Sequence, residues 1–382
     1  MKVSTHIWRV AIVAFMTMAH VVEVWAEPLA TETVSGDSTA VNGADDRPWY
    51  RQLIDNGGRI NDPGINYPKF PRFVVNVYNW GDRVFNSYDS AYVVGTGRNW
   101  KVMLKNYAWM ESYMLLFSPR TRDMLHIRSE IYNDVGVYLS FMALSVGYTA
   151  KVNTLLGRPG RNRENLNFNF TSSRIYGSFD YSSTTGDTYI THFGKYNGGK
   201  RMSYNFNDIR HNSYIGQLYY FINNKRYSQA AAYCFSKYQL KSAGSAIVGL
   251  SVNHQRIDMD FSSLPQDMKS YLPSLEDIYR FRYTDYCAVG GYGYNFAIRP
   301  RRWLVNVTGL QSLGYRHSYS GSTHGDRDIV ASNLSLRFAL LYNHKAFFAT
   351  LTGNVNASFY FNSKYAFSNS IESLSLIVGA RF

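Results

Sequence analysis

Residues 371–382 read Ile-Glu-Ser-Leu-Ser-Leu-Ile-Val-Gly-Ala-Arg-Phe, and this stretch decides the fold. Counting back from the last residue, every second position is apolar: Phe382, Ala380, Val378, Leu376 and Leu374. Because successive side chains of a strand point to opposite faces, the pattern predicts a β-strand with one apolar face and one small or polar face. An amphipathic edge strand of a soluble domain has the same pattern, so the rest of the chain must decide between the two.

Longer alternating runs precede this strand. In the clearest one, residues 347–361, apolar residues at odd positions alternate with Thr350, Thr352, Asn354, Asn356 and Ser358. Similar runs cover residues 165–170, 245–253, 285–296, 303–315 and 333–342. Several reach about 14–16 residues, more than the ~9–11 that a tilted strand needs to cross a bilayer. Such strands are also long for a globular domain.

The first 26 residues have the features of an export signal. Lys2, His6 and Arg9 precede a short apolar run, and small residues at positions 24 and 26 predict cleavage after Ala26. No later segment approaches the ~18 consecutive apolar residues of a spanning helix. A membrane protein that crosses with strands must close into a barrel, because lipid satisfies no open sheet edge. The content of 16% aromatic and 18% charged residues suits such a barrel.

The sequence therefore predicts an all-β fold, a transmembrane antiparallel β-barrel of about 14 strands. Twelve is the alternative, because residues 122–131 and 201–208 are weak strands. The expected parts are a signal peptide (1–26), a flexible leader (27–45), a mostly irregular periplasmic segment or plug (46–109) and the barrel (110–382).

Connection lengths give the expected orientation of the barrel. Tight turns are predicted near residues 298–301, 343–344, 239–240, 209–210, 172–173 and 142. Longer polar loops are predicted at 257–282, 318–326, 362–370, 183–200 and 152–162. Outer-membrane barrels have short periplasmic turns and long external loops, so we expect Phe382 on the periplasmic side.

Two blocks of sequence carry a resemblance to known proteins. The first is Tyr78-Asn-Trp-Gly-Asp82, Phe85-Asn-Ser-Tyr-Asp89 and Tyr92-Val-Val-Gly-Thr-Gly-Arg-Asn-Trp-Lys101; the second is Tyr227-Ser-Gln-Ala-Ala and Gln239-Leu-Lys-Ser-Ala-Gly-Ser245. Both resemble an uncharacterised family of exported Gram-negative proteins classed as a domain of unknown function. The resemblance covers about residues 48–382 and implies an outer-membrane barrel, with no assigned catalytic residue or ligand.

The last strand also resembles the closing strand of Gram-negative outer-membrane barrels. Those barrels typically end on Phe, and their assembly machinery reads that end. The resemblance implies that Phe382 is an assembly signal for the barrel-assembly machinery.

If Phe382 and Phe361 face lipid, the alternate positions line the lumen. The candidate lining residues are Arg316, Arg337, Thr350, Thr352, Asn354 and Asn356. Hydroxyl, amide and guanidinium groups of this kind fit a hydrated pore and a hydrogen-bonded filling equally well.

No catalytic residue, cofactor or metal site is predicted. Ser251 and His254 point to opposite faces of one strand, and a nucleophile needs its base within about 3 Å. Cys234 and Cys287 lack the spacing of metal ligands and are expected to be isolated, packed thiols.

The formal net charge of +13 favours anionic partners. The charge is scattered and no nucleic-acid motif is present, so a nucleic-acid partner is not expected. Five basic residues fall in two predicted external loops: Arg158, Arg161, Arg163, Lys200 and Arg201. They are candidates for contact with lipopolysaccharide phosphates in the outer-membrane lipid, with simple solvation as the alternative.

The predicted function is that of a non-enzymatic outer-membrane pore, transport or surface-structural protein. The alternative is an outer-membrane hydrolase of the lipase or protease type with its site at the external rim. Whether the lumen is open or plugged, and the oligomeric state, are left open by the sequence.

Overall fold

A computed structural model describes residues 47–56, 60, 62–85, 87–98, 100–118, 123–141, 144–152, 164–323, 328–361 and 364–382. These residues belong to one compact unit, Arg47–Phe382. The expected signal peptide and leader lie outside the described residues.

The segment expected to be mostly irregular contains two helices, α2 (Trp49–Asp55) and α3 (Lys69–Phe85). Apolar residues at Phe70, Phe73 and Trp80 recur at helical spacing, and Pro71 lies in the first turn, where a proline is tolerated. Shorter helical turns are η1 (Tyr196–Gly199), α5 (Gln229–Tyr233) and α6 (Gln266–Lys269). None of the helices in the described ranges is long and apolar enough to cross a membrane.

Strands make up most of the rest. The first ones are β1 (Val93–Gly95), β2 (Trp100–Ser118), β3 (Asp123–Ser129), β4 (Tyr132–Phe141), β5 (Leu144–Lys151), β6 (Glu164–Thr171), β7 (Ile175–Thr185), β8 (Thr188–Phe193) and β9 (Tyr204–Asn205). Then follow β10 (Ile209–Phe221), β11 (Lys237–Gln239), β12 (Ala243–Asp260), β13 (Ile278–Arg299), β14 (Trp303–Ser318), β15 (Asp328–His344), β16 (Phe347–Phe361) and β17 (Ala366–Arg381). Every ladder between them is antiparallel.

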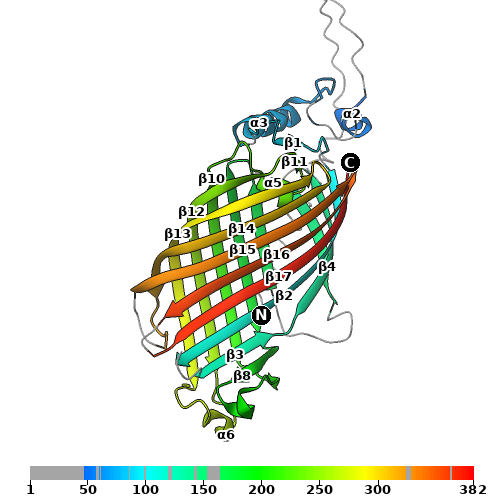
Figure 1. The fold of residues 1–382 in the computed structure, drawn as a ribbon. Coiled ribbons are helices and arrows are strands. Elements are labelled where there is room, and N and C mark those ends of the chain that lie inside the picture. Colours follow the sequence, from blue (N-terminus) through cyan, green and yellow to red (C-terminus); the bar gives the residue numbers. More distant parts are fainter. Residues whose placement is uncertain are drawn as a thin grey trace, which may run out of the picture. The chain divides into compact units, whose positions relative to one another are not determined.

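The large sheet returns to its starting point. Its order runs β7-β10-β12-β13-β14-β15-β16-β17-β2-β3-β8, and β8 follows β7 in the chain after two residues. β7 pairs with β10 at one end of this order, and β8 pairs with β3 at the other. The ring of strands is therefore joined through β3 and β8 (Figure 1). Beyond this joint, β5 pairs with β4 and β6 pairs with β7.

Within the described ranges, the strands make twelve passes across this sheet, the smaller number that the sequence allowed. β3 with β4, β7 with β8, and β9 with β10 are each one pass interrupted by a few residues. The first pass begins at Trp100, so the expected start of the barrel at residue 110 was placed too late. Residues before Trp100 had no clean alternation, but the strand itself crosses the expected boundary without a break.

The turns predicted near 298–301 and 172–173 are present between β13 and β14 and between β6 and β7. The turn predicted at 343–344 lies two residues later, at 345–346, because β15 continues to His344. The turn predicted at 209–210 is wrong, because these residues begin β10. The turn predicted at 239–240 is also wrong: β10 and β12 are joined by residues 222–242, which contain α5 and β11. The loop predicted at 362–370 is shorter, since β17 begins at Ala366. Residues 142 and 153–162 lie outside the described ranges.

The two faces of the sheet have the reverse of the polarity found in a water-soluble protein: the outer face is apolar and the inner face is polar. Apolar side chains are exposed along the outer face: Leu250, Val252, Tyr286, Val307, Leu313, Leu336, Phe338, Leu374, Leu376 and Val378. Polar side chains are buried along the inner face: Ser245, Asn253, Gln255, Asp285, Asn295, Asn306, Thr308, Ser375 and Arg381. An exposed apolar band of this extent is stable only against lipid. In water, each Å² of apolar surface left unburied forgoes about 25 cal/mol of stabilising free energy. The predicted alternation of residues 374–382 is thereby confirmed.

Candidate functional site: a filled lumen

Residues 222–242, which we call the plug segment, fold into the lumen beside Phe382. Arg381 Nε donates to Phe235 O (2.6 Å) and Lys101 Nζ donates to Cys234 O (2.8 Å), which fixes the segment at this end of the barrel. We call this end the Phe382 rim and the opposite end, which carries α6, the α6 rim (Figure 1).

Helix α5 brings three alanines against the wall. Ser228 caps it by accepting from Ala231 N (3.2 Å), and the side chains of Ala230, Ala231 and Ala232 are buried. Ala231 and Ala232 pack in one cluster with wall residues Leu304, Ala339, Leu341 and Phe348. Small side chains let the helix backbone approach the wall closely, and a larger residue here would force the helix off it.

Buried amides anchor the plug segment to β13 and β14. Asn295 Nδ2 donates to Ser228 O (2.9 Å) and to Gln239 Oε1 (3.0 Å). Gln239 Nε2 donates to Arg226 O (2.7 Å), and Asn306 Nδ2 donates to the Tyr227 phenol oxygen Oη (3.1 Å). These bonds give most buried polar groups of the segment a partner, with the buried Gln229 Oε1 as an exception, so the segment is a packed filling rather than a loose loop.

Residues 88–95, which precede the first strand of the barrel, also bond to the plug segment. β1 pairs with β11, aligning Val93 with Gln239, and Asp89 N donates to Lys225 O (2.8 Å). Ser228 Oγ donates to the Tyr88 hydroxyl (3.1 Å). Residues 46–109 were the expected plug, but the filling of this rim comes from 222–242. The one sequence sign was the loss of alternation through Gln229-Ala-Ala-Ala232, after a serine able to cap a helix.

A buried glutamate and a buried histidine meet on the inner face of the wall. Glu111 of β2 and His211 of β10 approach to 3.4 Å between Oε1 and Nδ1, and both are buried. The Tyr113 hydroxyl donates to Glu111 Oε2 (2.7 Å), and His211 Nε2 donates to Gln255 Oε1 (2.5 Å). Around the ring, β2 and β10 are separated by β3 and by the β7–β8 pass, so these contacts join non-adjacent strands of the wall.

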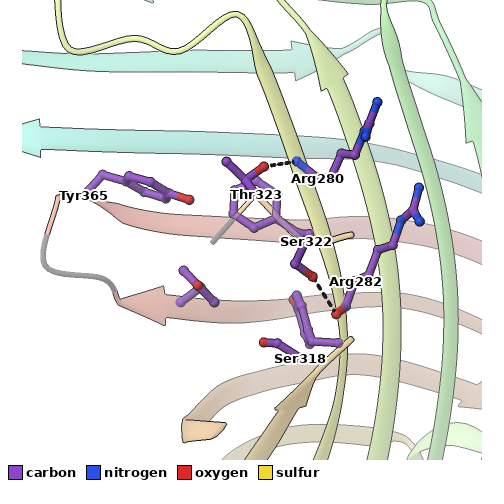
Figure 2. Close-up of a pocket in the computed structure, with 9 residues that line it drawn as sticks. Arg280, Arg282, Ser318, Ser322, Thr323 and Tyr365 are labelled. Carbon is purple, nitrogen blue, oxygen red and sulfur yellow. Dashed lines mark hydrogen bonds between the residues drawn. The ribbon is translucent and has the colours of Figure 1, made fainter. Parts of the chain in front are cut away.

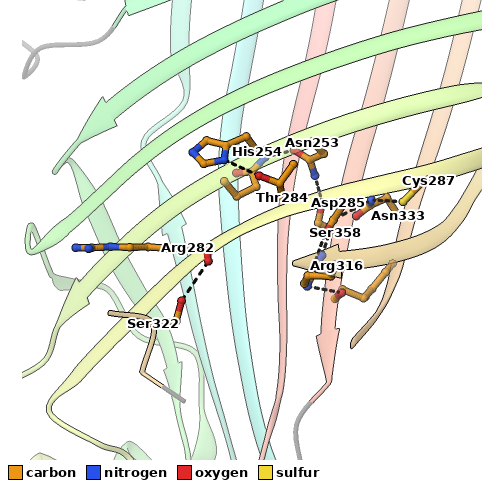
Figure 3. A network of polar contacts seen from close by, with 12 residues as sticks. Asn253, His254, Arg282, Thr284, Asp285, Cys287, Arg316, Ser322, Asn333 and Ser358 are labelled. Carbon is orange, nitrogen blue, oxygen red and sulfur yellow. Dashed lines mark hydrogen bonds and ion pairs between the residues drawn. The ribbon is translucent and has the colours of Figure 1, made fainter. Parts of the chain in front are cut away.

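A second ion pair lies on β13 and β14. Arg316 donates to Asp285 through Nε and Nη2, the latter at 2.7 Å, and both side chains are 0% exposed (Figure 3). The guanidinium lies 3.8 Å from the Tyr283 ring centroid, and Asn333 Nδ2 donates to Asp285 Oδ2 (3.1 Å). A bidentate pair with further partners compensates the loss of hydration of both charges.

Apolar side chains fill the lumen towards the α6 rim. The cluster includes Tyr113, Leu115, Leu125, Ile127, Phe193, Phe206, Ile257, Met259, Phe261, Leu272, Tyr279, Phe281, Tyr283 and Phe367. Phe281 and Phe367 stack with 4.0 Å between ring centroids. With the plug segment at the Phe382 rim and the buried polar pairs between, described residues occupy the lumen from one rim to the other.

The pockets that accompany this filling are small. One at the α6 rim lies beside Arg280, Arg282, Ser318, Thr323 and Tyr365 (Figure 2), and another beside Arg302 lies at the Phe382 rim; each has a volume of about 10 Å³. That is near the space of a single water. Within the described ranges, no three His, Cys, Asp or Glu side chains gather to hold a metal ion.

The structure places the predicted lining residues as follows. Arg316 and Thr350 are buried, and Arg337 Nη2 donates to Gln217 Oε1 (3.0 Å). Asn354 and Asn356 each have a buried Oδ1 without a hydrogen-bond partner in the described part of the chain. Thr352 is half-buried on the same strand.

Other predicted residues have separate positions. Lys200 and Arg201 are exposed between η1 and β9, whereas Arg158, Arg161 and Arg163 lie outside the described residues. Cys234 and Cys287 are free, as predicted. Ser251 is buried, and His254 bonds instead through Nδ1 to Thr284 Oγ1 (2.8 Å), so these two do not form a catalytic pair (Figure 3).

The outer wall changes character near the α6 rim. Register places Tyr214, His254, Thr284 and His317 in one row, beyond the apolar residues Val252 and Tyr286. The next rows contain Arg256 beside Arg282, and Arg210, Asp258 and Arg280. Asp258 lies 3.5 Å from Arg256 Nε and 3.6 Å from Arg282 Nη2, which leaves a surplus of positive charge.

The ring of ladders joined through β3 and β8, the apolar outer face and the occupied interior define a transmembrane antiparallel β-barrel with a filled lumen. The chain belongs to the family described as "Domain of unknown function (DUF4421)", which matches residues 87–382. No curated protein matches the sequence significantly.

Three solved structures are similar to this chain, all with low sequence identity and low TM-scores. The outer-membrane protease OmpT of Escherichia coli has 8% identity over 74% of this chain and 97% of its own, with a TM-score of 0.30. The toluene transporter TodX of Pseudomonas putida has 8% identity, coverage of 78% and 92%, and a TM-score of 0.25. The translocator domain of the autotransporter NalP of Neisseria meningitidis has 9% identity, coverage of 81% and 94%, and a TM-score of 0.27. Scores this low carry no weight, so the fold rests on this chain's own ladders.

Proposed function

We propose that this protein is a sealed outer-membrane β-barrel, a surface-structural protein rather than a pore. The observation that carries the proposal is the plug segment, whose buried Ala231 and Tyr227 pack on and bond to the wall. The ion pairs Glu111–His211 and Asp285–Arg316 fill the region beyond it. A solute would have to separate these contacts to pass.

The proposed location is the outer membrane, after cleavage of the signal peptide. The Phe382 rim is then periplasmic, since the tight turns beside β13–β14 and β15–β16 lie there and α6 lies in a longer external loop. Fractionation tests this assignment: the folded protein is expected in outer-membrane fractions and to migrate differently before and after boiling. Recovery in the soluble periplasmic fraction would contradict it.

The proposed partners are outer-membrane lipid and, at the α6 rim, lipopolysaccharide phosphates. Arg256, Arg280 and Arg282 lie on the outer wall just beyond the row of His254, and exposed Lys200 and Arg201 add to the positive charge at this rim. Guanidinium groups at headgroup depth pair well with phosphate. Phe382 remains the proposed signal for the barrel-assembly machinery.

Efflux from liposomes tests the sealed barrel. Vesicles containing the purified full-length protein should retain a small entrapped dye as well as protein-free vesicles do. An open porin serves as the positive control. Release by this protein at a rate near that of the porin would favour the transport function instead.

A further inference from the structure

A serine and a histidine meet on the outer wall, away from the lumen. Ser112 of β2 and His126 of β3 are 2.8 Å apart between Oγ and Nε2. On the ring's other side, His126 Nδ1 lies 2.6 Å from Thr191 Oγ1 of β8. All three side chains are half-buried on the outward face, opposite the buried residues Tyr113 and Ile127.

A β-bulge positions this group. The β3–β8 ladder aligns His126 with His192 and Ile127 with Ile190, so Thr191 is the extra residue between two registers. Bulges re-aim side chains, and this one turns Thr191 towards the His126 ring and main chain. Because Ser112, His126 and Thr191 lie on the outer face, they neither pack in the interior nor help to fill the lumen.

The hydrogen bonds are compatible with the His126 tautomer that a general base needs. When the Thr191 hydroxyl donates to His126 O at 3.2 Å, its oxygen can accept from Nδ1–H. Nε2 then carries no hydrogen and accepts the Ser112 O–H. A serine hydroxyl bonded to the free nitrogen of an oriented imidazole is the arrangement of an activated nucleophile.

Basic and apolar groups surround Ser112 on different sides. Arg128 is its direct cross-strand partner on the outer face, and Ser370 of β17 is its partner on the other side. Towards the Phe382 rim, the outward face of β17 becomes apolar from Leu374 onward, with Leu376 and Val378 also exposed. Ser112 therefore has this apolar face on one side and the charged Arg128 on the other, a setting suited to an ester with an apolar chain and a polar headgroup.

We propose that Ser112, His126 and Thr191 form a hydrolytic site for carboxylic esters of lipids, with Ser112 as nucleophile, His126 as general base and Thr191 as positioning residue. This activity goes beyond the sealed barrel and does not depend on it. Arg128 is placed to stabilise the negative charge that develops on the carbonyl oxygen.

The reaction follows from these positions. Ser112 Oγ attacks the ester carbonyl carbon while its proton passes to His126 Nε2. The tetrahedral oxyanion collapses, the bond to the alcohol oxygen breaks, and Nε2–H protonates the leaving alcohol, which gives acyl-Ser112. A water then attacks the acyl carbon and loses its proton to Nε2; the bond to Ser112 breaks and Ser112 regains a proton. One ester and one water yield one carboxylic acid and one alcohol.

Two measurements on the refolded full-length protein test the site. A fluorophosphonate probe reports the nucleophile by mass spectrometry of the labelled peptide. A phospholipid with a fluorescent acyl chain, in mixed micelles, reports turnover. The variants are Ser112→Ala, His126→Ala, Thr191→Val and Thr191→Ser, with Ser370→Ala as the matched control on the adjacent strand. Different migration before and after boiling shows that each variant is folded.

We expect the probe to label Ser112 in the wild type and in Ser370→Ala. Turnover should fall by about 10³-fold or more in folded Ser112→Ala and His126→Ala. Thr191→Val should lower the labelling rate, and Thr191→Ser should restore it, since only a hydroxyl keeps the tautomer. Absence of labelling at Ser112 in folded wild type, or equal turnover by Ser112→Ala, would overturn the proposal.

Discussion

The main chains of Trp100 and Phe382 bond to each other in both directions, with N–O distances of 3.0 Å for each bond. This pair ends the β2–β17 ladder and joins the first pass of the barrel to the last. The final strand thus has partners on both sides, β16 and β2. A chain with an open edge here would leave a row of main-chain groups unsatisfied in lipid.

The first prediction tests this closure by crosslinking. In a background without Cys234 and Cys287, cysteines at Val102 and Ala380 should form a disulfide, because these residues are direct partners on β2 and β17. Peptide mapping after mild oxidation measures the link. Cysteines at Val102 and Leu376, on the same face but out of register, should stay reduced. The opposite pattern would show a different register.

The second prediction concerns the ion pair Asp285–Arg316. Arg316→Leu leaves a buried, uncompensated carboxylate and should lower the free energy of unfolding by about 3–5 kcal/mol. Replacing both residues, as in Asp285→Asn with Arg316→Leu, should recover part of that loss. Urea unfolding in detergent or lipid measures both. If the double variant is less stable than Arg316→Leu, the unpaired Asp285 carboxylate is not the cause of the stability lost in the single variant.

The third prediction tests the membrane-facing band. Leu250 and Ile298 are each 65% exposed on the outer wall, but Leu250 lies within β12 and Ile298 lies one residue from the end of β13. Leu250→Arg should cost about 2–4 kcal/mol in a bilayer, and Ile298→Arg about 0–1 kcal/mol, because the cost depends on depth. Reversible unfolding in lipid vesicles measures the difference. Equal costs would mean that this face does not meet hydrocarbon.

The sequence was sufficient to predict which face of a long strand points outward, because apolar residues occupy every second position of that strand. Leu374, Leu376 and Val378 fix the outward face of β17, and no other arrangement leaves them stable. The lumen was harder, because serine, asparagine and arginine suit water and hydrogen-bonded packing alike. Asn295 and Asn306 acquire their role only through contact with the plug segment, about seventy residues earlier in the chain.

The outer-wall site was also beyond the sequence. Ser112 and His126 lie on neighbouring strands, and His126 falls in residues 122–131, which have only a weak strand pattern. Thr191 comes next to them only through the β3–β8 ladder that closes the ring. Such a ladder between distant passes has no local signal.

The fourth prediction is a pH dependence in the plug segment. Burial raises the pKa of the Tyr227 phenol above its ordinary value of 10.0. The unfolded chain therefore ionises first as the pH rises, and the stability that neutral Tyr227 contributes below pH 10 is lost above it. Tyr227→Phe keeps the ring without an ionisable group.

The wild type should accordingly lose stability more steeply above pH 10 than Tyr227→Phe does. Unfolding midpoints at several alkaline pH values measure the two slopes. Parallel slopes would mean that the Tyr227 phenol reaches water in the folded protein.

Single-channel recording of the purified full-length protein in a planar bilayer tests the central claim most directly. The sealed barrel predicts a silent bilayer once insertion is verified, while an open porin recorded under the same conditions gives current steps. Stable, repeated current steps from this protein would show that the plug segment, the two ion pairs and the apolar cluster leave a conducting path.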